Sequence, residues 1–103
     1  MKNLAALWLE FGAPTNHSLK QDIEDHSYPG QEKIAQYLED GEVKLMSTGT
    51  GKDLFTGETV AANYYIATDG EYSWPSTLSY YVRSYNLRLP KEFEQKILGL
   101  TGI

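Results

Sequence analysis

One stretch decides the fold of this chain: Thr68-Asp69-Gly70-Glu71-Tyr72-Ser73-Trp74-Pro75. Its Asp-Gly pair is flanked by strand-forming residues and predicts a β-hairpin, because both central positions of a type I′ turn require positive φ. Pro75 predicts the end of the second strand and, through its fixed φ, the start of a helix. We therefore expect strands over about residues 61–67 and 71–74.

A further strand is predicted upstream of this hairpin, over about residues 42–47. Polar and apolar residues alternate in Glu42-Val43-Lys44-Leu45-Met46, which is the period of a half-buried strand. The loop from Ser47 to Thr59 follows, with three glycines and no regular period. We therefore expect a small three-stranded antiparallel sheet, which needs helices to cover it.

Five helices are predicted from apolar residues at helical spacing. They cover about residues 3–11, 19–26, 31–40, 76–85 and 90–98. A capping box of Ser18 and Gln21 marks the start of the second helix, and Pro90 and Gly99 mark the two ends of the last. Helices at both ends of a small sheet make an α+β fold, and residues 1–103 have the length of a single domain.

The composition indicates a folded protein of the cytoplasm. Apolar residues make up 41% of the chain and charged residues 22%, as in ordinary globular domains. The absence of cysteine excludes disulfides and thiolate chemistry and agrees with a reducing compartment. Glu10 interrupts the apolar start of the chain, which argues against a signal peptide, and no apolar run is long enough for a membrane helix.

The net charge of −5 is unevenly distributed along the chain. Residues 22–42 carry seven carboxylates against Lys33 alone, a local charge of −6. Such a segment repels nucleic-acid phosphates, so we expect no nucleic-acid partner, and it attracts a basic protein. The alternative is a solvated helical face that only aids solubility.

A phosphate-binding loop is suggested by Thr48-Gly49-Thr50-Gly51-Lys52, which is similar to the end of such a loop. Met46 stands where the first glycine is required, and Asp53 replaces the hydroxyl residue that holds magnesium. We therefore interpret the segment as a turn-rich loop and expect no bound nucleotide.

Two histidines and two aspartates fall close together in the sequence: His17, Asp22, Asp25 and His26. Histidine and carboxylate side chains can bind zinc or another divalent ion. His17 precedes the predicted helix and would have to fold back to reach the others. We therefore predict neither a metal site nor a cofactor.

The sequence offers little support for catalysis. Asp69 and Glu71 stand two residues apart, and paired carboxylates can hydrolyse glycosides, but an aspartate is also expected at this kind of turn. No serine, histidine and acid are arranged in the order that nucleophilic catalysis would need. We therefore predict that the protein is not an enzyme.

Aromatic residues suggest a binding surface, because eight of the thirteen fall between Asn63 and Phe93. In the predicted helix over 76–85, Tyr80 and Arg83 lie off the apolar stripe, and tyrosine and arginine are enriched at interface hot spots. The alternative is that these residues are half-buried. Together with the acidic segment, they make the predicted partner-binding residues Asp22, Glu24, Asp25, Glu39, Asp40, Tyr64, Tyr80 and Arg83.

The second half of the chain resembles a known pattern. The residues concerned are Thr68-Asp69-Gly70-Glu71-Tyr72, Trp74-Pro75, Leu78, Tyr80-Tyr81-Val82, Tyr85, Leu89-Pro90 and Phe93, with a weaker likeness from Tyr28 to Gly41. This pattern is similar to one in small uncharacterised bacterial proteins, some of which resemble immunity proteins of toxin systems. The resemblance implies a fold more than an activity, and it assigns no role to an individual residue.

The function expected from these observations is non-catalytic binding of another protein. Its specific version is a bacterial immunity protein that neutralises a basic toxin. The alternative is a small-molecule-binding domain or small enzyme with an aromatic pocket near Trp74, where Asp69 or Glu71 would be the polar group. Self-association into a homodimer is a third alternative.

Overall fold

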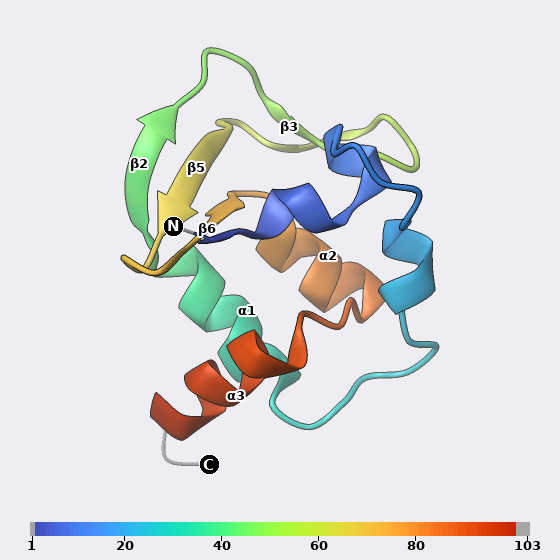
Figure 1. Cartoon of the computed structure of the whole chain (residues 1–103). Helices are drawn as coiled ribbons and strands as arrows, with labels where there is room; N and C mark the ends of the chain where they lie inside the picture. The colour runs from blue at the N-terminus through green and yellow to red at the C-terminus, as the bar shows by residue number, and fades with distance from the viewer. Residues whose placement is uncertain (1, 101–103) are drawn as a thin grey trace.

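The computed structural model describes residues 2–100 and shows an α+β fold (Figure 1). Its α-helices are α1 (Gln31–Glu39), α2 (Leu78–Tyr85) and α3 (Lys91–Leu100). The predicted fold class is therefore confirmed, and these helices lie where the last three were predicted. Asn86 ends α2 in the left-handed conformation. Gly99 was predicted to mark the end of the last helix, but it lies inside α3.

The main sheet has four strands in the order β1-β6-β5-β2. Its strands are β1 (Lys2–Asn3), β2 (Glu42–Met46), β5 (Tyr65–Thr68) and β6 (Tyr72–Pro75). The predicted antiparallel meander is present as β2-β5-β6, but β1 pairs with β6 in parallel and makes the sheet mixed. The prediction missed β1 because two residues carry no period of their own.

The hairpin between β5 and β6 turns one residue later than the type I′ turn that was predicted. Gly70 has a φ of 98°, and Asp69 is not among the residues with positive φ. The Asp69 carboxylate instead accepts the backbone N–H groups of Glu71 at 2.9 Å and Tyr72 at 2.7 Å. The central pair is therefore Gly70-Glu71, with glycine at the first central position as in a type II′ turn.

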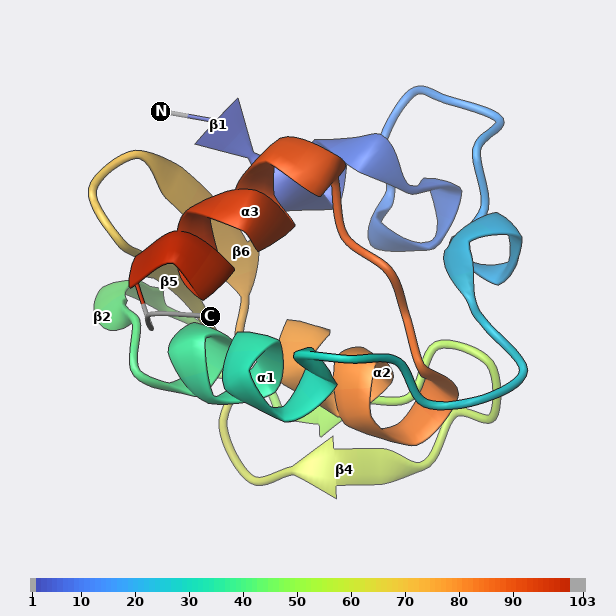
Figure 2. The same ribbon diagram turned by 90° about the horizontal axis from the view of Figure 1, so that it is seen from below.

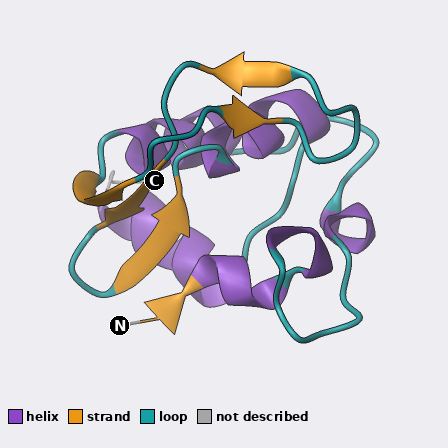
Figure 3. Cartoon of the chain, turned by 90° about the horizontal axis from the view of Figure 1, so that it is seen from above, coloured by secondary structure: helices purple, strands orange, loops and turns teal. Residues whose placement is uncertain are grey.

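A second sheet of two strands lies beside α2 (Figure 3). It pairs β3 (Gly51–Lys52) with β4 (Thr59–Ala61). The strand predicted over 61–67 therefore starts later, at Tyr65, because Ala61 pairs with Gly51 of β3 instead and residues 62–64 connect β4 to β5. The backbone of β3 passes close to the start of α2, since a Cβ atom on Gly51 would lie 2.7 Å from Thr77 Cγ2.

The helix predicted over residues 3–11 was wrong. Short 3-10 turns at Leu4–Leu7 and Leu9–Phe11 replace it, and Trp8 is extended between them. The N–H of Leu9 donates to the His17 carbonyl at 2.8 Å, so a long-range contact takes the group that an α-helix would have used. Isolated helices of this length are marginal, and tertiary contacts therefore decide their conformation.

The helix predicted over residues 19–26 is also much shorter than expected. The capping box of Ser18 and Gln21 is present, but only a 3-10 turn at Leu19–Asp22 follows it. Ile23 is extended and forms a β-bridge with Leu87, which ends the turn.

Helices α1 and α3 lie side by side below the main sheet and cover it (Figures 1 and 2). The ring centroid of Phe93 on α3 lies 4.6 Å from that of Tyr72 and 5.7 Å from that of Trp74, both on β6. The indole N–H of Trp74 donates to the Leu38 carbonyl on α1 at 3.0 Å. These contacts bury the aromatic rings in the core. None of the helices in the described part of the chain has the length and apolar character to cross a membrane.

Candidate functional site

Strand β2 is exposed along its whole length and lies at one end of the main sheet (Figure 1). Its outer edge pairs with no other strand among residues 2–100. Three of its residues are large and apolar, and 49% of Val43, 66% of Leu45 and 58% of Met46 is exposed to solvent. A sheet edge that exposes such side chains can pair with a strand of another chain, because its outward N–H and C=O groups are available for hydrogen bonds. We call Asp40, Glu42, Val43, Leu45 and Met46 the β2 edge surface.

A β-bulge places these apolar side chains on both faces of the sheet. Val43 lies opposite Ala67, whereas Leu45 lies opposite Ile66, so Lys44 is the extra residue. Directly opposite residues share a face, and neighbouring residues of β5 point to opposite faces. Val43 therefore shares the face of buried Ala67 that the helices cover, and Leu45 points to the other face. The apolar surface consequently wraps around the edge of the sheet.

An open groove of about 570 Å³ lies next to this surface. It is formed by the end of α1, the first residues of β2 and the turn that starts at Thr68. The acidic residues Asp40, Glu42 and Asp69 line it, together with Lys44. The groove therefore has an excess of negative charge.

Asp69 belongs to the framework of this groove. Its Oδ2 atom accepts a bond from Lys96 Nζ at 2.8 Å and another from the Tyr37 hydroxyl at 2.7 Å. Burial alone would raise the pKa of Asp69, but the bonds from Lys96, the Tyr72 backbone and Tyr37 outweigh it and hold the pKa well below its ordinary value. Burial and the bond to Asp69 raise the pKa of Tyr37 to about 12. Asp69 is therefore ionised and paired with Lys96.

The end of α1 adds to the negative potential. Helix carbonyls give the C-terminus a partial negative charge, and basic residues normally balance it there. The last turn of α1 has no basic residue, and Glu39 and Asp40 stand at its end. Arg83 pairs with Glu39, while Asp40 Oδ1 accepts a bond from Gln36 Nε2 at 3.0 Å. A cation from outside would therefore be stabilised beside Asp40.

The predicted residues on α1 and α2 are tied to one another. Arg83 on α2 forms ion pairs with Glu32, at 2.6 Å, and with Glu39, both on α1. Tyr80 is half-buried, and its hydroxyl donates to Asp53 at 2.7 Å. Tyr64 is also half-buried. Tyr80 and Arg83 therefore hold elements of this chain together, and they do not form one exposed surface with Tyr64.

The fold-back that a metal site would require does occur at Asp22. Its Oδ2 atom lies 2.7 Å from His17 Nε2 and accepts the indole N–H of Trp8 at 2.8 Å. Even so, no three histidine, cysteine or carboxylate side chains within residues 2–100 come together as a metal ion would need. The two contacts of Asp22 hold the loop before residue 18 close to Trp8.

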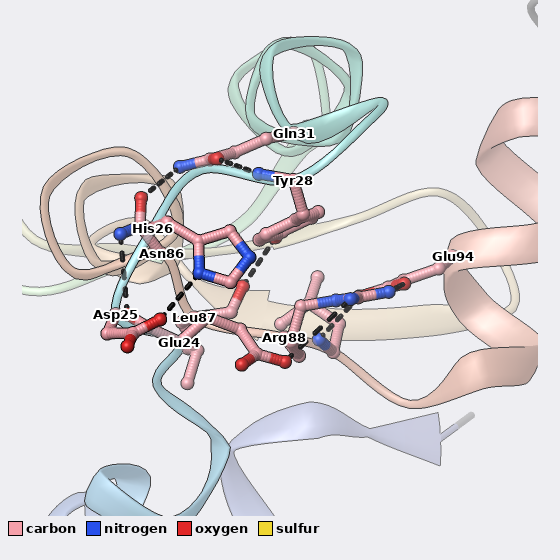
Figure 4. Close-up of polar contacts among 10 residues, drawn as sticks. Glu24, Asp25, His26, Tyr28, Gln31, Asn86, Leu87, Arg88 and Glu94 are labelled. Atoms are coloured by element: carbon pink, nitrogen blue, oxygen red, sulfur yellow. Dashed lines mark hydrogen bonds and ion pairs between the residues drawn. The ribbon is translucent and has the colours of Figure 1, made fainter.

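The acidic segment after Asp22 packs against the connection between α2 and α3 (Figure 4). Tyr28 donates its hydroxyl to the Leu87 carbonyl at 2.5 Å, and the Arg88 guanidinium lies over the Tyr28 ring at 4.2 Å. Glu24 Oε1 lies 4.0 Å from Arg88, and Asp25 pairs with His26 while staying 93% exposed. Within the predicted acidic surface, Glu24 and Glu39 therefore have arginine partners. The carboxylates beside the exposed apolar side chains of β2 are Asp40 and Glu42.

Asp53 is a buried carboxylate whose structural role was not predicted from the sequence, where it was noted only as a mismatch to the phosphate-binding loop pattern. Only 1% of it is exposed. Burial alone would raise the pKa of Asp53, but hydrogen bonds from Tyr85 and Tyr80 and from the backbone of Phe55 and Thr56 lower it. With four donors around it, Asp53 anchors the loop to α2. An aspartate followed by Thr56-Gly57 is a turn signal that could have indicated this role.

Comparison of the chain with protein-family models, with curated protein sequences and with solved structures finds no match. The interpretation of the β2 edge surface therefore depends on its geometry and charge.

Proposed function

We propose that this protein is a non-catalytic module that binds another protein through the β2 edge surface. The observation that carries this function is the exposure of Val43, Leu45 and Met46 on a strand whose outer edge faces no other strand within residues 2–100. Contiguous apolar side chains on a soluble protein mark interaction sites, because water around them is released when a partner covers them.

The charge of the chain supports a basic partner. The net charge is −5, and Asp40 and Glu42 flank the apolar side chains at one end of β2. Complementary charge accelerates association and disfavours wrong partners. An immunity protein that covers a basic toxin is the specific version of this function, and the negative charge beside the apolar side chains supports it.

A ligand pocket near Trp74 has less support. The ring of Trp74 is 1% exposed and packs against Phe93 and Tyr37. The polar groups proposed for that pocket, Asp69 and Glu71, both pair with Lys96. A ligand would have to displace the core to reach the indole.

The test is co-expression with the products of neighbouring genes, followed by measurement of complex formation at low and high salt. Replacing Leu45 and Met46 by serine should weaken a complex by about tenfold or more, because both replacements remove apolar surface that the partner would bury. The matched control is Leu9→Ser with Leu54→Ser, since these residues are 51% and 44% exposed away from β2. The proposed function would be refuted if no neighbouring gene product forms a complex, or if the Leu45/Met46 variant binds with the same affinity as the Leu9/Leu54 control.

A further inference from the structure

On the basis of the proposed function, we infer that the partner supplies an extended segment that pairs with β2 as an additional strand. This segment carries a lysine or arginine that enters the groove beside Asp40 and Glu42, and apolar residues that cover Val43, Leu45 and Met46. The partner surface is thus a basic, strand-forming segment of another protein.

The backbone of β2 is suited to pair with another strand. In an antiparallel pair, alternate residues direct their N–H and C=O groups away from the neighbouring strand. The inner side of β2 pairs with β5 from Glu42 to Met46, and its outer side faces no strand of the described chain. The opposite end of the sheet offers only the two residues of β1. β2 is therefore the longer template for strand addition, a common mode of peptide recognition.

The apolar side chains require a partner that reaches both faces of the sheet. Leu45 points to one face, and Val43 points to the face that the helices cover. A helix laid on one face would cover only part of this surface. An added strand directs alternate side chains to both faces and can therefore cover all of it.

The charges set the chemistry of the segment and the end of β2 at which its basic side chain lies. Asp40 and Glu42 lie at the start of β2, where the negative end of α1 also lies. A basic side chain at this end of the added strand would be attracted to both carboxylates. Lys44, in the middle of β2, would repel a basic side chain opposite it.

The same features disfavour a second copy of this chain as the occupant. A twofold pair of β2 strands centred on Lys44 would place Lys44 opposite its own copy, and like charges opposite each other are destabilising. Each copy would also bring a net charge of −5. Bulges and edge lysines are devices that prevent sheets from pairing indiscriminately, and β2 has both at Lys44. The added strand must therefore be complementary to this edge.

The first experiment selects dodecapeptides from a random phage-displayed library on the immobilised full-length chain. Selected peptides should carry β-branched or aromatic residues at neighbouring positions, which point to opposite faces, and lysine or arginine toward one end. Their affinity should fall by about tenfold or more in Leu45→Ser/Met46→Ser and stay unchanged in Leu9→Ser/Leu54→Ser. The double substitution Asp40→Asn/Glu42→Gln should lower the peptide affinity by about two- to fivefold and make this affinity less dependent on salt, as expected for exposed ion pairs.

The second experiment tests backbone pairing with two N-methylated forms of the best peptide. One form carries methyl groups on the odd amides and the other on the even amides. Strand addition predicts that one form loses about tenfold or more in affinity and the other stays within about twofold, because only one set of amides faces β2. Amide hydrogen exchange in residues 43–46 should also become slower when the unmethylated peptide binds.

Each outcome separates this inference from the proposed function. Equal losses from both methylated forms, or unchanged exchange in β2, would overturn strand addition even if Leu45→Ser/Met46→Ser abolishes binding to a natural partner. Selection of acidic peptides, or of none, would overturn the chemistry of the segment. Sedimentation that reports a dimer disrupted by Leu45→Ser/Met46→Ser would identify a second copy as the occupant instead.

Discussion

At the scale of single residues, two aspartates hold loops by the same device. The Oδ1 atom of Asp53 accepts the N–H groups two and three residues later, and Oδ1 of Asp69 does the same. Each Oδ2 atom then accepts side-chain donors from helices: Tyr80 and Tyr85 for Asp53, and Tyr37 and Lys96 for Asp69. One carboxylate thus shapes a turn and attaches it to the helical layer.

We predict that Tyr80→Phe destabilises the protein by about 1–2 kcal/mol, because it removes one donor from the buried Asp53 carboxylate. Urea unfolding followed by circular dichroism measures this loss. The control is the same substitution in an Asp53→Asn background, where a smaller loss is expected because the two residues are coupled. An identical loss in both backgrounds would show that the hydrogen bond contributes no stability.

At the scale of elements, the connection from α1 to β2 depends on Gly41. A Cβ atom at this position would lie 2.6 Å from Trp74 Cζ2 and 3.2 Å from Ala67 Cβ. The chain therefore passes directly over the core tryptophan before it enters the exposed strand. Because Gly41 does not have a positive φ, close approach is what requires glycine here.

We predict that Gly41→Ala destabilises the protein by about 1–3 kcal/mol, because the added methyl group must push against the indole or the strand. Thermal and urea unfolding both measure this change. The matched control is Gly49→Ala, where the nearest atom is Ser47 Oγ at 3.8 Å, and we expect little change there. If Gly41→Ala is as stable as the wild type, the connection has more room than this geometry indicates.

At the scale of the whole molecule, stability depends on carboxylates whose pKa values are lower in the folded state. Both Asp53 and Asp69 are of this kind. The unfolded chain therefore binds protons first as the pH falls, and the stabilisation is complete above the unfolded pKa of about 4. It is lost progressively as the pH falls below that value toward the folded pKa values.

We predict that the urea midpoint decreases steeply below about pH 4. Measurements at a series of pH values between neutral and about pH 2 follow this loss. Asp53→Asn should lower the midpoint at neutral pH and make its decrease below about pH 4 shallower, because one titrating group has been removed. A variant that keeps the wild-type slope would show that Asp53 does not contribute to the acid sensitivity.

The amino-acid sequence alone determined the elements that depend on near neighbours. Apolar spacing located α1, α2 and α3, and the Asp-Gly pair located the hairpin, because these signals lie within a few residues of one another. The charge of a segment can also be read directly from its residues, and it placed Asp40 among the predicted partner-binding residues, which stay a prediction.

Contacts between distant residues decided the rest. The alternation in β2 predicted a half-buried strand, yet nothing in the described chain pairs with its outer edge, so Val43, Leu45 and Met46 are exposed. Residues 4–11 have a helical period but form two 3-10 turns, because hydrogen bonds to other segments, such as that from Leu9 to His17, compete with a helix too short to be stable alone. Whether an apolar residue is core or interface depends on what covers it, and only the tertiary structure contains that information.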